Sequence, residues 1–563
     1  MKKYRAIPIG IEFYKKMIDK EYYYIDKTLL IRDLLQNNGD VTLFTRPRRF
    51  GKTLTLTMLK AFFEKEILPD GTVLDNSEYF QGKKIMDAGE EYTRHMGQYP
   101  VIFLSLKSAK QPTYEMAYDI LIRTLSKEFN RHRYVLNGDA LSQKQKNIYN
   151  EIMNETAKSS DYATVIQFLS ECLEQYHGKK TVILIDEYDV PLENAYFRGF
   201  YEKMVVFIRS LFESALKTND YLQFAVISGC LRISKESIFT GLNNLKVVTM
   251  LDDSYAESFG FVQSEVDEML DFYGIAKRKE ELREWYDGYL FGETEVYNPW
   301  SVLNYVFDIL ERNTEFPKPY WSNTSSNSIV KELIENADIE TKDEIEKLIE
   351  GGSIEKPVHE DITYSDVYLS QDNLWNFLFF TGYLKMVTKR FVNRVMYISV
   401  RIPNQEILYL YENQVRDWMY KRTRAADFTE LYEAVKSGNT KVFEDIMNKQ
   451  LRETISIMDS SENFYHGFLL GLLGAMPGYR KISNRESGEG RYDIVLEPYD
   501  MMDSVIILEI KRAVRFQDME KKCHEALKQI DEKHYDAEFV YVGYPVIKKY
   551  GICFCRKNCM MRI

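Results

Sequence analysis

Several features common in sequences of this length are scarce or missing here. Only six cysteines occur in 563 residues, too few for a disulfide framework, and this favours a reducing compartment. No run of about 18 apolar residues is present, which argues against a membrane-spanning helix. The opening MKKYRAIPIGIEFYKKM lacks the apolar core and the small-residue cleavage site of a signal peptide. We therefore expect a cytoplasmic protein that does not enter a membrane.

An excess of positive charge is also missing, because 85 Asp and Glu outnumber 74 Lys and Arg. The formal net charge is −11, which argues against a protein that coats nucleic acid through bulk electrostatics. Two segments depart from this balance, because residues 41–60 and 541–563 each contain five Lys or Arg side chains and no acid. The length of the chain predicts about three or four domains, so a local basic site on one of them is compatible with an acidic total.

The stretch LFTRPRRFGKTLTLTMLK, residues 43–60, lacks a glycine where a phosphate-binding loop usually has one. The pattern G-x-x-x-x-G-K-[ST] asks for glycine at position 46, and Arg46 stands there. The surroundings fit such a loop, since VTLFT (41–45) reads as a strand and residues 53–66 read as a helix. Taken alone, the GKT tripeptide is equally consistent with a surface loop.

If the loop binds a nucleotide, its last three residues have separate roles. Gly51 stands where the backbone must approach a phosphate closely. Lys52 would reach the terminal phosphates, and the Thr53 hydroxyl would bind Mg²⁺. The free N–H groups and the positive dipole end of the following helix favour phosphate at the same place.

Two later strands support the nucleotide hypothesis. TVILIDEYD (181–189) is an apolar run that ends in Asp186 and Glu187. At a strand end in a phosphate-loop enzyme, the first acid holds Mg²⁺ through water and the second polarises the attacking water. LQFAVISG (222–229) contains Ser228 at the place where such folds put a polar residue that senses the terminal phosphate. The alternative is a capped strand end with exposed acids. Alternating strands and helices predict a parallel α/β sheet with ligands at the carboxyl ends of its strands.

The C-terminal part contains a second set of acids. Residues 460–476 read as an apolar helix with Glu462 at its start, followed by GEGRYDIVLEP with Asp493 and SVIILEIKRA with Glu509 and Lys511. Strand alternation puts Glu509 and Lys511 on one face, and a hairpin can bring Asp493 beside them. The three carboxylates would bind Mg²⁺ or Mn²⁺, and Lys511 would hold or deprotonate the attacking water. The alternatives are a solvated strand face and, for Glu462, a favourable position in a first helical turn.

Taken in order, the motifs resemble a known family, the prokaryotic AAA-ATPase-like proteins, whose members often carry a C-terminal PD-(D/E)xK nuclease-like domain. The motifs that carry this resemblance are YYYIDKT (22–28), RPRRFGKT (46–53), LIDEYD (184–189), SGCLRISKESIFTGLNNL (228–245), WYDGY (285–289), YNPWS (297–301) and YWSNTS (320–325). In this family the loop usually reads RPRRFGK, so Arg46 is its normal form. The resemblance implies ATP as the nucleotide. Arg48 and Arg49 of the loop, and Arg232 after Ser228, would add positive charge near its phosphates; for all three, salt bridges with acids are the alternative.

The sequence therefore predicts an α/β protein of three parts. We expect a P-loop ATPase domain with an AAA-like (ASCE) parallel sheet over residues 1–254, a helical and winged-helix-like lid over 255–440, and a PD-(D/E)xK nuclease-like domain over 441–563. The expected function is ATP hydrolysis coupled to metal-dependent cleavage of DNA, with RNA and a homo-oligomer left open. The alternative is a non-cleaving, nucleotide-dependent switch that binds nucleic acid or a partner, including in defence against foreign DNA.

Overall fold

The computed structural model is divided into two compact units, and each is described by itself. One comprises residues 1–325 and 355–409, and the other comprises residues 326–354 and 410–563. The residues that the structure describes are 5–37, 39–217, 219–232, 238–239, 244–312, 316–321, 330, 338–359, 367, 370–425, 428–453, 462–474, 476–483, 486–487 and 490–563.

The first unit is built on a five-stranded parallel sheet. Its strands are β1 (Val41–Thr45), β2 (Val101–Ser105), β3 (Thr181–Asp186), β4 (Leu222–Gly229) and β5 (Leu245–Val248). The order β2-β3-β4-β1-β5 places β4 between the strand before the phosphate loop and the strand that ends in acids. Every residue of β1 and β3 is buried, which explains their continuous apolar runs.

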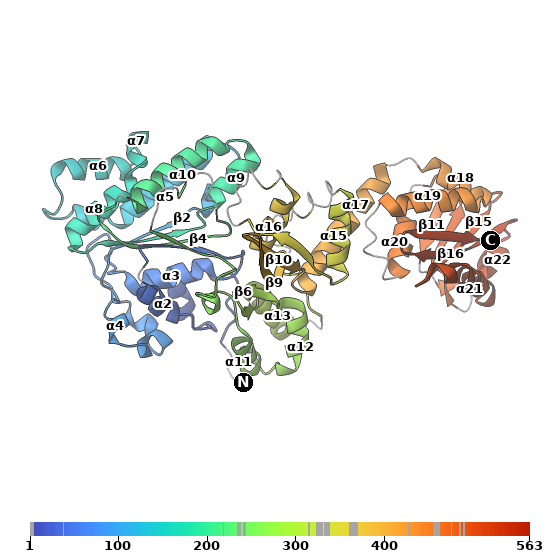
Figure 1. The fold of residues 1–563 in the computed structure, drawn as a ribbon, viewed down its shortest axis with the longest axis horizontal. Coiled ribbons are helices and arrows are strands. Elements are labelled where there is room, and N and C mark those ends of the chain that lie inside the picture. Colours follow the sequence, from blue (N-terminus) through green and yellow to red (C-terminus); the bar gives the residue numbers. More distant parts are fainter. Residues whose placement is uncertain are drawn as a thin grey trace. The chain divides into compact units, whose positions relative to one another are not determined.

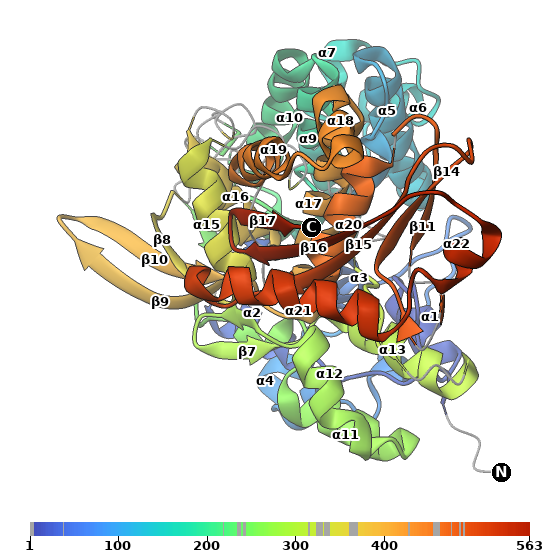
Figure 2. The same ribbon diagram turned by 90° about the vertical axis from the view of Figure 1, so that its right-hand side faces the viewer.

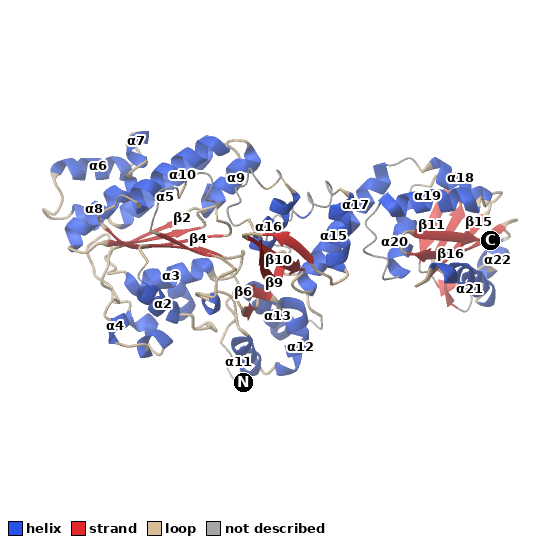
Figure 3. Cartoon of the chain, viewed as in Figure 1, coloured by secondary structure: helices blue, strands red, loops and turns tan. Residues whose placement is uncertain are grey.

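Helices cover both faces of this sheet. In Figures 1 and 3, α5, α8 and α10 lie on one side of the strands, and α2 and α3 lie on the other. The helices of this layer and its surroundings are α1 (Tyr14–Asp19), α2 (Leu29–Asn37), α3 (Lys52–Phe63), α4 (Glu90–Thr93), α5 (Tyr114–Arg131), α6 (Gln143–Met153), α7 (Ser159–Tyr162), α8 (Val165–His177), α9 (Val190–Arg198) and α10 (Tyr201–Leu216). The parallel α/β sheet predicted from the sequence is confirmed.

The rest of this unit is a helical region followed by a small sheet. Its helices α11, α12 and α13 bury an aromatic and aliphatic cluster. The small sheet has the order β8-β10-β9, and α16 precedes its β9–β10 hairpin. The elements are α11 (Gln263–Tyr273), α12 (Lys279–Tyr286), β6 (Tyr289–Phe291), β7 (Thr294–Val296), α13 (Pro299–Arg312), β8 (Ile354–Pro357), α16 (Gln371–Thr381), β9 (Lys385–Val392) and β10 (Val395–Arg401). Of α17 (Gln405–Ala425), residues 405–409 belong to this unit and residues 410–425 to the second.

The second unit contains a mixed five-stranded sheet in the order β11-β14-β15-β16-β17. β14 and β15 form the expected antiparallel pair, and β15 and β16 run parallel. Figure 1 shows α18, α19 and α20 on one side of this sheet and α21 on the other. The elements are α15 (Ile339–Ile349), α18 (Thr429–Ser437), α19 (Thr440–Glu453), α20 (Glu462–Leu473), β11 (Tyr479–Ser483), β12 (Glu486–Ser487), β13 (Gly490–Arg491), β14 (Ile494–Pro498), β15 (Val505–Arg512), α21 (Met519–Glu532), α22 (Ala537–Val542), β16 (Ile547–Cys555) and β17 (Asn558–Arg562).

The basic C-terminal segment, residues 541–563, does not form an open cationic surface. Lys549 pairs with Asp531 and Asp536, Lys557 lies near Asp343 and Glu346, and Arg562 pairs with Glu444 and Glu520. The ammonium group of Lys548 donates to a backbone carbonyl. Three of its five cations are thus paired with acids from other elements, so its composition alone was a poor guide to a phosphate-binding surface.

Within the part of the chain that the structure describes, no helix has both the length and the apolar character needed to cross a membrane.

Candidate functional site

The phosphate loop joins β1 to α3 and has the geometry that its sequence requires. Gly51 has a φ of +83°, in the left-handed region that glycine adopts without strain, and α3 begins at Lys52. Arg49 also has a positive φ, of +71°. Arg46 does not have a positive φ, so this position has no conformational need for glycine.

The side chain of Arg46 points into the protein instead of toward a phosphate. It is fully buried, and its Nη1 donates to the carbonyl oxygens of Thr45 and Val248 over 3.1 Å each. Its guanidinium carbon lies 4.7 Å from the ring centroid of Phe291, a cation–π contact. Burial lowers the pKa of Arg46 to about 9. Arg46 therefore attaches the start of the loop to β5 and to the helical region.

Asp186 is the point where three of the predicted residues meet. The Thr53 hydroxyl donates to its Oδ2 over 2.8 Å, and the Ser228 hydroxyl donates to its Oδ1 over 2.6 Å. The Asp186 side chain is completely buried. Since β4 lies between β1 and β3, the sheet order itself brings these three residues together. All three groups offer oxygen atoms, the ligands that Mg²⁺ prefers.

Glu187 follows Asp186 and turns into the adjoining cavity. Its φ is +53°, an uncommon conformation for a residue with a side chain. Burial, and then the charge of Asp186, raise the pKa of Glu187, while Lys52 acts in the opposite direction. Gly229 is needed beside this turn, because a Cβ atom there would lie 2.4 Å from the ring of Tyr188. A carboxylate with a raised pKa is the better proton acceptor, so Glu187 suits the role of polarising water.

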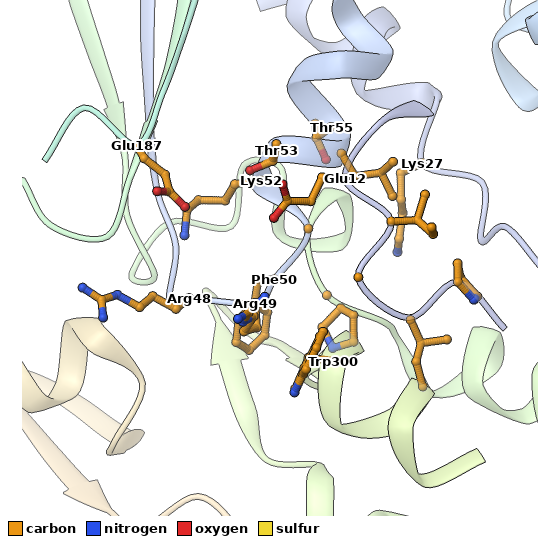
Figure 4. Close-up of a pocket in the computed structure, with 18 of the residues that line it drawn as sticks. Glu12, Lys27, Arg48, Arg49, Phe50, Lys52, Thr53, Thr55, Glu187 and Trp300 are labelled. Atoms are coloured by element: carbon orange, nitrogen blue, oxygen red, sulfur yellow. The ribbon is translucent and has the colours of Figure 1, made fainter. Parts of the chain in front are cut away.

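Lys52 is held by the loop itself. Its Nζ donates to the carbonyl oxygens of Arg46 and Pro47 over 2.8 and 2.9 Å, and it lies 3.7 Å from the thiol of Cys230. Figure 4 shows its ammonium group close to the carboxylate of Glu187. The cation is therefore kept at the loop by weak neutral acceptors that a phosphate can replace.

A cavity of about 350 Å³ lies in front of the loop. Its walls come from residues 8–12 and 23–27, the loop, the ends of β3 and β4, and residues 299–303 of the helical region. Of the predicted residues, Arg49, Gly51, Lys52, Thr53 and Glu187 line it directly. The cavity has both a charged side and an apolar side, as a nucleotide needs for its phosphates and its base.

The other two loop arginines, Arg48 and Arg49, also have partners inside the chain. Arg48 donates to Glu193 over 2.6 Å, and the guanidinium carbon of Arg49 lies 4.4 Å from the ring centroid of Trp300. Figure 4 shows Arg49 and Trp300 together below the loop. Arg232 is half-buried after β4 and is not among the described residues that line the cavity.

Sequence reasoning missed two residues of this site. Trp300 forms the wall opposite the loop, and Asp189 accepts hydrogen bonds from the N–H groups of Cys230 and Leu231 over 2.7 and 3.2 Å. Both occur in motifs of the family resemblance, YNPWS and LIDEYD, which were the only signal available for them. Asp189 fixes the chain that follows β4, and with it the thiol beside Lys52.

The second unit brings Asp493, Glu509 and Lys511 together. Asp493 immediately precedes β14, and its Oδ2 accepts the N–H of Ile510 on β15 over 2.8 Å. The Nζ of Lys511 donates to Glu509 Oε1 over 3.0 Å. The antiparallel register, in which Ile494 lies opposite Leu508, puts the carboxylate of Asp493 beside the central part of β15.

Glu509 is a buried carboxylate with one oxygen unused. Gln529 on α21 donates to Oε1, the oxygen that Lys511 also uses. Oε2 is buried and has no hydrogen-bond partner among the described residues. Burial, and then the charge of Asp493, raise the pKa of Glu509 to about 7, although Lys511 lowers it. Leaving a buried carboxylate oxygen without a partner is costly, so this position calls for a bound cation or water.

The predicted third acid, Glu462, is the first residue of α20, and its side chain lies outside what the structure describes. Across the described residues, no group of three or more His, Cys, Asp or Glu side chains is placed to hold a metal ion. Asp493 and Glu509 still provide hard oxygen ligands, which fit Mg²⁺ or Mn²⁺ better than a soft metal.

The first unit, with its phosphate loop on a parallel sheet, has the fold of a P-loop NTPase. Residues 8–239 match the family model described as predicted AAA-ATPase, and residues 460–562 match the PD-(D/E)XK nuclease superfamily. The chain thus carries an AAA-ATPase-like domain at its N-terminal end and a PD-(D/E)XK nuclease superfamily domain at its C-terminal end. The resemblance drawn from the motifs is confirmed.

The chain is also similar to an uncharacterized protein encoded in the vnfD 5′ region of Azotobacter chroococcum mcd 1. The two are 27% identical over 340 residues, which is 59% of this chain and 56% of that relative. The similarity therefore spans little more than half the length of either protein.

Proposed function

We propose that this chain hydrolyses ATP at its N-terminal site and cleaves DNA phosphodiester bonds at its C-terminal site. Three domains are proposed for these tasks: the ATPase domain over residues 1–254, a lid over 255–440 and the nuclease domain over 441–563. The six free cysteines support a reducing, cytoplasmic location.

In the proposed ATPase, Lys52 exchanges its two carbonyl acceptors for the terminal phosphates. Thr53 and Asp186 are the residues that would hold Mg²⁺, which neutralises phosphate charge when bound. Glu187 orients and polarises the attacking water from the end of β3. Ser228, bonded to Asp186, is placed to register the state of the terminal phosphate through that carboxylate.

In the proposed nuclease, Asp493 and Glu509 are the residues that would hold Mg²⁺ or Mn²⁺, with Glu462 as a further candidate. Such an ion supplies positive charge to the phosphate and lowers the pKa of water. Lys511 orients the attacking water from its position beside Glu509. Gln529 keeps the carboxylate of Glu509 in place from the neighbouring helix.

One observation carries the nuclease part of the proposal, namely the buried Glu509 oxygen that has no partner among the described residues. A strand that only displayed acids to solvent would leave both oxygens hydrated. Here the carboxylate is 2% exposed and is flanked by a second carboxylate and a lysine. Perturbed carboxylates of this kind gather at functional sites.

The test is cleavage of plasmid and linear duplex DNA by the full chain with Mg²⁺ or Mn²⁺, with and without ATP. The variants are Glu509→Gln and Lys52→Ala. The matched control is Glu532→Gln, which makes the same change on α21 at a carboxylate that is 62% exposed. We expect Glu509→Gln to abolish cleavage, Lys52→Ala to remove ATP hydrolysis and any effect of ATP on cleavage, and Glu532→Gln to behave as the parent.

Undiminished cleavage by Glu509→Gln would contradict the proposed nuclease site. ATP hydrolysis without cleavage of any substrate would instead support the alternative of a nucleotide-dependent switch that binds nucleic acid. The same reactions with RNA distinguish the two kinds of substrate.

A further inference from the structure

The β9–β10 hairpin is a two-stranded ribbon with an exposed outer half. Its strands pair in antiparallel register from Val392 opposite Val395 down to Lys385 opposite Arg401. Asn393 and Arg394 form the turn, with φ values of +49° and +69°, as in the tight turns that suit a twisted hairpin. Figure 2 shows the tip extending away from the elements around it.

This ribbon lies in the longest acid-free part of the middle region. From residue 373 to residue 405 the sequence contains five Lys or Arg side chains and no Asp or Glu, within a chain of net charge −11. Lys385 is buried, but Lys389, Arg390, Arg394 and Arg401 are exposed. The ribbon is therefore a third basic segment of the chain. Unlike residues 41–60 and 541–563, it was not singled out from the composition of the sequence.

Its paired cations are more exposed than those of the C-terminal segment, at 38% and 58% against 28–35%. Arg394 has no ion pair with any described residue. Lys389 lies 3.1 Å from Glu293, and Arg390 pairs with Glu355, but both partner acids are well exposed. Exposed ion pairs contribute little and exchange readily, so these cations remain able to meet a phosphate.

An aromatic side chain completes the surface. Phe391, next to the turn, is 74% exposed, although its size would favour burial. It lies on the same face of the ribbon as Lys389, two residues away. Cations interleaved with an exposed aromatic ring are the combination with which proteins hold a phosphate backbone and insert a ring between bases.

We propose that the β9–β10 hairpin binds double-stranded DNA, with Lys389 and Arg394 against the phosphates and Phe391 against the bases. A two-stranded ribbon has the width that a groove of duplex DNA accepts. The choice of DNA as the partner rests on the proposed function. The binding itself requires neither nucleotide hydrolysis nor cleavage, so the two can fail separately.

The test is the affinity of the full chain for a short fluorescent DNA duplex, measured by anisotropy with EDTA and without nucleotide across a series of salt concentrations. We expect Phe391→Ala to weaken binding roughly tenfold, in the range of a lost ring–base contact. We expect Arg394→Ala to reduce the slope of log affinity against log salt concentration by about one, the signature of one lost phosphate contact.

Two controls match these changes elsewhere on the surface. Phe316→Ala removes a ring that is 73% exposed, and Arg133→Ala removes an exposed arginine far from the hairpin in the sequence. Both should bind as the parent does. Parent-like affinity and salt slope in Phe391→Ala and Arg394→Ala would overturn the proposal, as would a preference for single-stranded DNA or duplex RNA. If the hairpin variants weaken DNA binding but the parent cleaves no DNA, this proposal is supported and the proposed nuclease activity is contradicted.

Discussion

Asp186 and Glu509 are both buried carboxylates on the central strands of a sheet, but their surroundings differ. Asp186 receives one hydroxyl on each oxygen, from Thr53 and Ser228. Glu509 receives an ammonium and an amide on a single oxygen, and its other oxygen has no partner among the described residues. In the proposed nucleotide site, both oxygens of the carboxylate thus have a donor within the chain, whereas in the proposed nuclease site only one does.

The difference indicates how each site responds to its ligand. At Asp186, a bound ion has to replace the Thr53 hydrogen bond, so binding of the metal alone gains little and the phosphates must contribute. At Glu509, a cation would satisfy an oxygen that is otherwise costly to bury. We therefore expect divalent metal to bind first, and without nucleotide, at the C-terminal site.

The largest effect should come from Glu509→Gln. We expect DNA cleavage to fall by roughly 10²–10⁴-fold, while thermal stability at neutral pH stays the same or rises, because the amide carries no buried charge. Cleavage assays and a thermal melt measure the two quantities. A loss of both stability and activity in this variant would show that the carboxylate of Glu509 stabilises the fold. Glu509 would then no longer differ from Asp186, whose hydrogen bonds are expected to stabilise the fold.

Glu406 sharpens the comparison, because both of its oxygens accept hydrogen bonds and yet burial raises its pKa to about 7. The protonated form is favoured in the folded state, so folding stability should fall as the pH rises from about 4.5 to 7, by on the order of 3 kcal/mol. Glu406→Gln should remove this contribution and leave that of Glu509, whose pKa is also raised to about 7, as measured by denaturant titration at acidic and alkaline pH. Glu202→Gln, at an exposed carboxylate, is the control; a parent-like slope in Glu406→Gln would refute the assignment.

Ser228→Ala should affect the complete site more than its small size suggests. It leaves Asp186 Oδ1 without its hydroxyl donor, and we expect a loss of about 1–3 kcal/mol in folding stability together with slower ATP hydrolysis. Ser160→Ala, an exposed serine on α7, provides the control. Unchanged stability in Ser228→Ala would mean that the hydrogen bond from Ser228 is not needed to stabilise the buried carboxylate of Asp186.

The smallest expected effect is the increase in folding stability when a divalent metal ion is added without nucleotide. At ten times its dissociation constant, Mn²⁺ should stabilise the C-terminal unit by about 1.4 kcal/mol. Hydrogen exchange locates this stabilisation, which we expect along β15 in the parent and not in Glu509→Gln. Slower hydrogen exchange along α3 and β3 instead would mean that the metal binds first at the N-terminal site, the opposite of what we expect.

Much of both sites was predictable because their signals are local. The GKT tripeptide between a strand and a helix, the acids at the end of β3 and the E-x-K alternation on β15 each lie within a few residues, and the structure places them on those elements. The roles of all the site residues remain predictions, those of Lys52, Asp186 and Glu509 as much as those of Glu187, Arg232 and Glu462. The salt bridges of residues 541–563 could not be predicted, because the acids that form them lie on α15, α19 and α21 and at the start of α22.

The sequence by itself determined the two folds and the residue types of the two sites, because hydrophobic periodicity and short motifs depend on neighbours along the chain. Only the tertiary structure decided how those residues are used. It turned Arg46 inward onto Phe291, brought Trp300 across from the loop, and directed Gln529 to the same oxygen of Glu509 that Lys511 occupies. These outcomes depend on contacts between distant segments, and those contacts are set by packing rather than by local pattern.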